Sequence, residues 1–238
     1  MKTGKMTMVL ALAVALAGAG CATSGRYVAL KEFSPPLPSE ENSPLKGRAI
    51  CVQPFVSAFS INDKLPDEHA VEPPKYSYVK LTEEETRLWD NEVDKLKKTT
   101  SKKDWPQIGY VRNMVGIVMS KVYALNDPGA WLTDTLKADL QKLGARLVGT
   151  SQEADAEISV RGTVKYFKVD MYMSYGADLV VDVELKPRTK AVVSRSLHTK
   201  AGRVAWSGSS YEFYQSLREC QQKLLRLVIA DIEQLLKE

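Results

Sequence analysis

The residues best suited to catalysis in this chain are its cysteines and histidines, and their spacing supports no active site. The chain has two histidines, His69 and His198, and neither belongs to an H-x-x-x-H or H-E-x-x-H pattern or to a cysteine pair with metal-ligand spacing. Cys51 with either histidine is a formal thiolate nucleophile, but no local pattern supports it. The chain also lacks G-x-S-x-G, a phosphate loop and a Rossmann fingerprint. We therefore expect no enzymatic activity, cofactor or metal.

Cys21 is placed for a different kind of chemistry. It follows the small residues Gly18 to Gly20, which themselves follow two lysines and the apolar run 8–17, so that residues 1–20 have the layout of a secretory signal peptide. The apolar run is well short of the roughly 20 residues that span a bilayer. A cysteine after small residues can be acylated before cleavage makes it the new N-terminus. The sequence therefore predicts a lipid anchor, with palmitate among its chains, at Cys21.

Ordinary secretion remains the alternative at this site. Gly18 stands where lipoprotein signals usually carry Leu, Val or Ile, and Ala17-Gly18-Ala19 is an A-x-A-like cleavage site. Loss of residues 1–20 removes Lys2 and Lys5 and no acid, so the net charge falls from +4 to +2 and no basic excess for nucleic acid remains. Ala22 follows the cysteine where inner-membrane retention favours Asp. We expect the periplasmic face of the outer membrane, with a soluble periplasmic or secreted form as the alternative.

The mature chain divides by composition into a tether and one domain. Residues 21–46 are rich in Ser, Glu and Pro with few large apolar residues, which predicts a flexible tether that lets the domain stand clear of the lipid headgroups. Residues 47–238 are long enough for one substantial core. Within them, residues 57–105 predict an insertion, because the first half is rich in proline and the second half carries a separate helix.

The periodicity of the domain predicts an α+β fold. We expect a mixed, largely antiparallel sheet of five to six strands with two packed helices and one inserted helix. The inserted helix, 83–98, begins with the capping box of Thr82 and Glu85, and a second helix follows Asp127-Pro128 and ends before Gly144. The predicted helices are 83–98, 128–143 and 212–236, and the predicted strands are 48–56, 145–148, 156–169 with a bulge at Tyr166-Phe167, 177–185, 190–198 and 203–208.

Two features of the domain leave alternatives open. Export would place Cys51 and Cys220 in an oxidising compartment, where they either form a disulfide or stay buried as free thiols. Residues 97–103 include four lysines, which either touch anionic lipid or form a solvated helix end that favours cations. The lysines are Lys97, Lys98, Lys102 and Lys103.

The turn expected at 171–176 has the composition of a binding surface. Flexible Met and amphipathic Tyr are common at such surfaces, and four of these residues are candidates for contact with a protein partner: Met171, Tyr172, Met173 and Tyr175. The alternative is that helix 83–98 covers them. We expect that helix to dock on the domain through Trp89, since an exposed tryptophan stripe would promote aggregation.

Several motifs resemble those of the YajG-like family of bacterial lipoproteins. They are I108-G-Y-V-R-N-M-V-G, D127-P-G-A-W-L-T-D-T-L-K-A-D-L-Q-K-L-G, A154-D-A-E-I-S-V-R-G-T-V, A177-D-L-V-V-D-V-E-L and G202-R-V-A-W. The resemblance covers residues 47–238, less well across 57–105, and implies an outer-membrane lipoprotein with a layout like the N-terminal domain of TolB or LpoB. We expect a non-enzymatic accessory or partner-binding subunit of a transport or envelope-assembly system. The alternatives are a lipoprotein that binds lipid or a small amphiphile, and a regulator of a peptidoglycan synthase.

Overall fold

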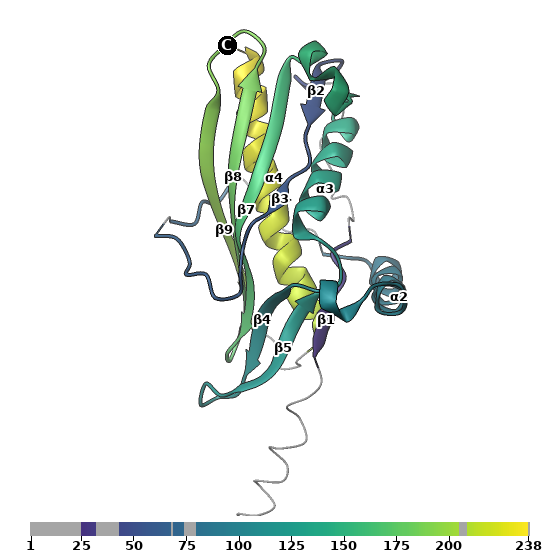
Figure 1. Cartoon of the computed structure of the whole chain (residues 1–238), viewed down its shortest axis with the longest axis vertical. Helices are drawn as coiled ribbons and strands as arrows, with labels where there is room; N and C mark the ends of the chain where they lie inside the picture. The colour runs from purple at the N-terminus through teal and green to yellow at the C-terminus, as the bar shows by residue number, and fades with distance from the viewer. Residues whose placement is uncertain (1–24, 32–42, 68, 74–79, 205–208, 238) are drawn as a thin grey trace, which may run out of the picture.

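The computed structural model describes residues 25–31, 43–67, 69–73, 80–204 and 209–237, which form a mixed α+β domain (Figure 1). None of the helices in these ranges is both long and apolar enough to cross a membrane. The helices are α2 (Glu83–Thr99), α3 (Pro128–Lys142) and α4 (Ser210–Lys237), with short 3-10 turns η2 (Lys102–Asp104) and η3 (Thr150–Asp155). The strands are β1 (Arg26–Val28), β2 (Ala49–Val52), β3 (Val56–Ser57), β4 (Gln107–Arg112), β5 (Val118–Ala124), β6 (Arg146–Val148), β7 (Ile158–Met171), β8 (Tyr175–Pro187) and β9 (Val193–Arg203).

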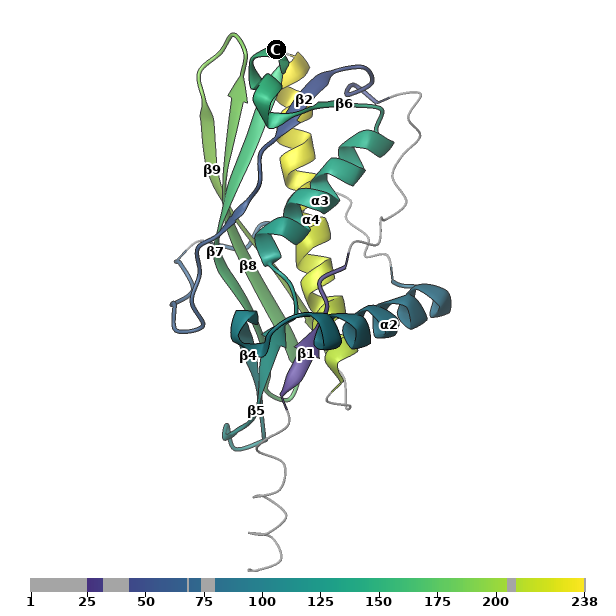
Figure 2. The same cartoon turned by 45° about the vertical axis from the view of Figure 1, so that its right-hand side comes forward.

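Strand β7 organises the sheet, because it pairs with other strands along both of its edges. One edge pairs antiparallel with β8 over the whole strand. The other edge pairs in parallel with β2 and β3 near its start and with β4 near its end. The register shifts between Val164 and Tyr166, which confirms the predicted bulge. The sheet therefore joins a half that contains β2 and β6 to a half that contains β4, β5 and β1 (Figure 2).

Helices α3 and α4 supply the apolar cover of the sheet. α4 packs along β8 and β9, and α3 lies beside it over β2, β6 and β7 (Figure 2). The predicted capping signals are confirmed: Asp127 accepts a hydrogen bond from Ala130 N–H, Thr82 and Glu85 form a capping box, and Gly144 follows α3 with a φ of +81°. These contacts join the helices and the sheet into one core.

The segment predicted as the start of a tether is in part a strand of the sheet. β1 pairs in parallel with β5, and Val28, Ala29 and Leu30 are buried in the core. The Leu30 N–H donates to Asn126 Oδ1 at 2.8 Å, which fixes the chain beyond the strand. The prediction of a tether over 21–46 is therefore wrong for residues 25–31, because even the three residues Arg26–Val28 form a strand where β5 supplies the hydrogen-bonding partners. It is also wrong for Leu45, which is fully buried in the core. Residues 32–42 lie outside the described residues.

Several strand boundaries also differ from those predicted. The strand expected at 48–56 is two strands, β2 and β3, because Pro54 cannot donate a ladder hydrogen bond. The two strands expected at 190–198 and 203–208 are the single strand β9, in which Gly202 pairs with Gly176 and makes no turn. Residues 205–208 lie outside the described residues. The hairpin of β4 and β5 was not predicted at all.

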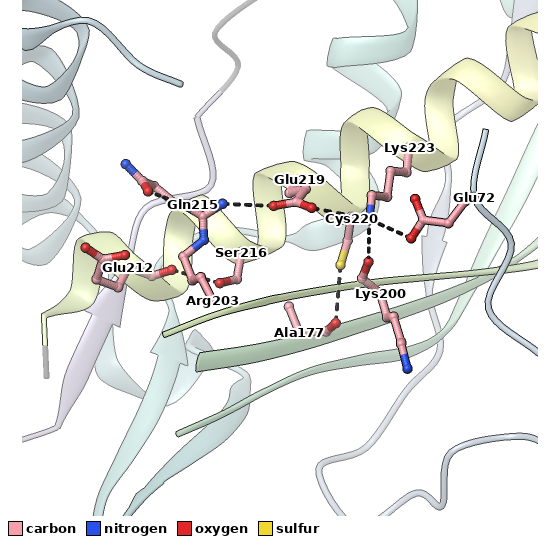
Figure 3. A network of polar contacts seen from close by, with 10 residues as sticks. All are labelled: Glu72, Ala177, Lys200, Arg203, Glu212, Gln215, Ser216, Glu219, Cys220 and Lys223. Carbon is pink, nitrogen blue, oxygen red and sulfur yellow. Dashed lines mark hydrogen bonds and ion pairs between the residues drawn. The ribbon is translucent and has the colours of Figure 1, made fainter. Parts of the chain in front are cut away.

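A polar network fixes α4 to the edge of the sheet (Figure 3). Lys223 is buried, and its Nζ lies 2.7 Å from Glu72 Oε1, 3.2 Å from Glu219 Oε1 and 2.9 Å from the Lys200 carbonyl oxygen. Arg203 on β9 donates to Glu219 at 2.9 Å. The network thus ties α4, β9 and the segment around Glu72 together.

The two cysteines within the described residues are free thiols, so the disulfide alternative is wrong and the buried alternative holds. Cys51 Sγ lies 3.8 Å from the Gly149 carbonyl oxygen, whereas Cys220 Sγ donates to the Ala177 carbonyl oxygen at 3.4 Å (Figure 3). Burial raises the pKa of the Cys51 thiol, and it raises that of Cys220 well above its usual range. Both sulfurs are therefore held as unreactive thiols and behave as small apolar groups.

Candidate functional surface at the paired hairpin tips

Two hairpins turn at the same end of the domain, opposite the end reached by the C-terminus of α4 (Figure 1). β4 runs parallel to the end of β7, with Val111 opposite Met171, so the chain leaves both strands at the same level. Gly109 allows this pairing, because a Cβ there would lie 2.0 Å from the Val169 carbonyl oxygen. The Tyr172 hydroxyl donates to the Met114 carbonyl oxygen at 3.2 Å and joins the two turns. We call residues 113–118 and 172–174 the hairpin tips.

The first tip is shaped by its own polar groups. Asn113 Oδ1 accepts hydrogen bonds from the N–H groups of Val115 and Ile117, at 3.1 and 2.8 Å. Gly116 has a φ of +84°, which an L-residue adopts only with strain, and its N–H donates to the Asn113 carbonyl oxygen. The backbone is thereby satisfied within the turn, so the apolar side chains of the turn point outward without supporting it.

The second tip holds a non-glycine residue in a left-handed conformation. Met173 has a φ of 62°, and its side chain is 68% exposed. A glycine would adopt this conformation without steric cost, and a methionine there contributes no packing. A strained residue with an exposed apolar side chain indicates a surface whose use lies outside the folded monomer.

The tips concentrate the exposed apolar side chains of the domain. Of twelve large apolar residues that are well exposed among the described residues, six lie in these two short turns. Such clustering exceeds the scattered exposure that is normal for a folded domain and makes the tips the candidate contact surface. The six are Met114, Val115, Ile117, Val118, Tyr172 and Met173.

Of the four residues predicted to form a partner surface, the structure exposes two and fully buries one. Tyr172 and Met173 are exposed, and Met171 is half-buried against the core. Tyr175 is fully buried, with its ring 4.7 Å from that of Phe213 in an edge contact. The covering element is therefore α4, and not the helix at 83–98. The alternation of buried residues along β8, when extended two residues back from Ala177, would have placed Tyr175 inward.

An ion pair lies at the base of the two tips, where the strands end. Arg112, the last residue of β4, has its Nη2 3.2 Å from Oδ2 of Asp170, the last residue but one of β7. Burial raises the pKa of the Asp170 carboxyl, against the opposing charge of Arg112. No charged residue occurs in 113–120 or 171–177. The tips are thus uncharged and apolar, with an ion pair at their base.

The other residues considered from the sequence lie elsewhere and have structural contacts. His198 is buried on β9 with its Nε2 2.9 Å from Asp178 Oδ1, whereas His69 is exposed. No group of three or more metal-ligating side chains occurs within the described ranges. Lys97 and Lys98 occupy the last turn of α2, and the Lys97 Nζ lies 5.0 Å from the centroid of the Tyr27 ring. These contacts favour the helix-end alternative for these two lysines.

Cavities occur near the opposite end of the domain. Three of about 330, 360 and 350 Å³ are lined mainly by polar and charged residues of the β2, β7 and β8 ends. One of them also touches Leu235 and Leu236 of α4. A site for an amphiphile would be lined mostly by apolar groups, so these cavities give that alternative no support.

Comparison with known proteins identifies the fold without naming a family. No family model matches the chain, and no curated protein matches it. The chain is similar to a Xanthomonas campestris protein of the DUF330 family, with 15% identity over 89% of this chain and 99% of that chain and a TM-score of 0.51. It also aligns with a lipoprotein of Neisseria meningitidis at 14% identity over 80% and 99% of the two chains, but the TM-score of 0.25 supports no inference. The shared feature is the fold, and the YajG-like resemblance stays a prediction.

Proposed function

We propose that this chain is a cell-envelope lipoprotein, anchored through Cys21, that serves a transport or envelope-assembly system as a non-enzymatic accessory subunit. The observation that carries the proposal is the position of β1. The strand begins at Arg26, five residues after Cys21, and is built into the sheet beside β5. An acylated Cys21 would thus hold a folded domain close to the membrane.

The chemistry of the N-terminal region supports the anchor. The apolar run and small residues before Cys21 suit cleavage at that cysteine, and acyl chains on one terminus give stable membrane attachment where a single chain does not. By analogy with the residue that follows the cysteine in retained lipoproteins, Ala22 favours the outer membrane.

The arrangement of the domain supports an accessory role over catalysis. The buried side chains that could act as nucleophile, base or acid have structural partners. Cys220 donates a hydrogen bond to a backbone carbonyl, His198 contacts Asp178, and Lys223 is paired with carboxylates. The exposed apolar side chains gather at the hairpin tips, which suits recognition of another surface more than it suits chemistry on a small molecule. Regulation of a peptidoglycan synthase is one form that such a role would take.

The anchor is tested by replacing its cysteine. In cells, Cys21→Ala should move the protein from the membrane to the soluble periplasmic fraction, while the control Ser24→Ala should stay with the membrane. Mass spectrometry of the parent should show an N-terminal acylated cysteine. A soluble parent that begins at Gly20 would contradict the proposal, and separation of the two membranes would decide between outer and inner placement.

The partner is sought with the anchored protein in cells. Crosslinking of the full chain, followed by identification of the captured proteins, should yield a subunit of a transport or wall-building system. Repeated capture of abundant lipid with no protein would favour the amphiphile-binding alternative instead.

A further inference from the structure

We infer that the paired hairpin tips insert into the surface of the lipid bilayer that holds the anchor. The inference rests on the proposed lipidation of Cys21 and goes beyond it, because a lipid anchor alone does not orient a domain. It assigns the exposed apolar residues of 113–118 and 172–174 to the membrane rather than to a protein partner.

The direction of β1 places the anchor on the side of the tips. The strand runs parallel to β5, with Arg26 opposite Val122, and β5 starts at the first tip with Val118. Going backward along the chain from Arg26 therefore leads toward the tips. In Figure 1, the start of β1 and the turn between β4 and β5 lie at the same end of the domain.

The chain between the anchor and the domain is short. Five residue steps separate Cys21 from Arg26, the start of β1, which at full extension reach about 17 Å. Four residue steps separate Val118 from Val122, the partner of Arg26 on β5, a rise of about 13 Å. The chain between the anchor and β1 can therefore reach only about one residue beyond the level of Val118 at the first tip. A membrane-bound Cys21 cannot hold the tips far from the headgroups while the chain continues in the direction of β1.

The side chains of the tips suit a membrane surface. Met114, Val115 and Ile117 are 60 to 76% exposed, and Met173 of the second tip is 68% exposed. Short apolar turns with an amphipathic tyrosine suit the boundary between headgroups and acyl chains, where the apolar groups leave water and the hydroxyl stays near it. The uncharged stretches end at Arg112 and Asp170, whose ion pair would remain at headgroup level.

The test uses a fluorescent label that reports its depth in the membrane. Val115→Cys places a thiol at the first tip, and Val192→Cys places one at an exposed valine in the turn between β8 and β9, at the opposite end of the domain. Cys51 and Cys220 are fully buried, and an acylated Cys21 has no free thiol, so the label goes to the introduced cysteine. The full-length lipidated proteins are reconstituted in vesicles of phosphatidylethanolamine and phosphatidylglycerol that carry nitroxide-labelled acyl chains.

The label at position 115 should be quenched from a depth of about 5–10 Å below the headgroups, and the label at 192 should not be quenched. Adding Ile117→Glu and Met173→Glu should lower the inserted fraction of the tip roughly tenfold, with the melting temperature unchanged, since the replaced side chains are exposed. Equal, weak quenching at 115 and 192 in protein shown by mass to be lipidated would overturn the inference and leave the anchor intact.

Two other outcomes would show that the anchor is absent or that the tips bind a protein. If the mass shows an unmodified N-terminus, the proposed anchor fails, and the inference fails with it. If position 115 is not quenched in vesicles but forms a specific protein adduct with a photo-crosslinking residue in cells, the tips bind a protein and the membrane assignment is wrong.

Discussion

Trp89 offers the sharpest test of the way in which α2 and the N-terminal strand join the domain. Its ring is 2% exposed, stacks on Tyr214 of α4 with centroids 5.3 Å apart, and donates from Nε1 to the Ala29 carbonyl oxygen at 2.8 Å. One side chain therefore connects α2, the segment after β1, and the start of α4. Its loss should loosen all three.

The magnitude follows from those contacts. Truncation of a buried aromatic to alanine costs about 3–5 kcal/mol, which includes the cavity that is left. Trp89→Phe keeps most of the ring but leaves the Ala29 carbonyl without its donor, at a cost of about 1–2 kcal/mol. For a chain of this length, Trp89→Ala should lower the melting temperature by roughly 10 °C.

The control is the neighbouring residue on the same helix. Leu88 is 40% exposed, so Leu88→Ala should change the free energy of unfolding by less than about 1 kcal/mol. The assay is denaturant unfolding of the full chain followed by circular dichroism, with hydrogen exchange to show whether α2 separates first. If Trp89→Ala unfolds at the same denaturant concentration as Leu88→Ala, the docking of α2 on the domain is refuted.

Three further outcomes follow from burial and backbone geometry. Tyr175→Ser should cost about 3 kcal/mol of stability while Tyr172→Ser costs less than about 1 kcal/mol, as measured by denaturant unfolding; equally small effects would contradict the burial of Tyr175. Cys51 and Cys220 should react with a thiol reagent only after unfolding, and rapid labelling of the native protein would contradict their burial. Met173→Gly should stabilise the fold by about 0.5–1 kcal/mol, because glycine adopts a φ of 62° without steric cost; a destabilised variant would show that the methionine side chain is packed.

The elements predicted correctly from the sequence are those with local signals. The capping box at Thr82, the cap at Asp127 and the glycine at 144 act within one turn of the backbone, so their residues identify helix ends without tertiary information. The alternation along β8 is equally local, since it needs only one buried face.

The elements that were missed depend on distant partners. β1 is three residues long, and Val28 is buried only because β5, almost a hundred residues later, lies beside it. The hairpin of β4 and β5 lacked a two-residue turn signal, since its turn is built by the side chain of Asn113 and by Gly116. Ala201-Gly202 looked like a turn, yet β8 continues opposite it and supplies ladder partners.

Only one of the two hairpins of the candidate surface was predicted from the sequence, for the same reason. The composition of 171–175 indicated exposed Met and Tyr residues, and the structure leaves Tyr172 and Met173 exposed. The contribution of Met114 to Val118 became evident only once the parallel pairing of β4 with β7 brought the two turns together. A candidate surface made of two hairpins cannot be predicted from either hairpin alone.

The polar network around Lys223 gives a prediction in the alkaline range. Burial lowers the pKa of Lys223, but the hydrogen bonds and charges of Glu72 and Glu219 outweigh it, so the pKa is raised overall. A lysine whose folded pKa exceeds its unfolded value contributes stability that is fully present below the unfolded pKa, about 10.4, and is lost as pH rises through the folded pKa.

Lys223→Met should therefore lower the free energy of unfolding at pH 8, and the gap between parent and variant should narrow as the pH passes 11. Burial also raises the pKa values of Tyr166 and Tyr175, and these tyrosines lower the free energy of unfolding of both proteins over the same pH range. The difference in free energy between parent and variant therefore reports the lysine alone. Urea unfolding at a series of pH values measures that gap. A gap that stays constant from pH 8 to pH 11.5 would mean that Lys223 acts through its packed methylenes, and that its charge contributes nothing to holding α4 on the sheet.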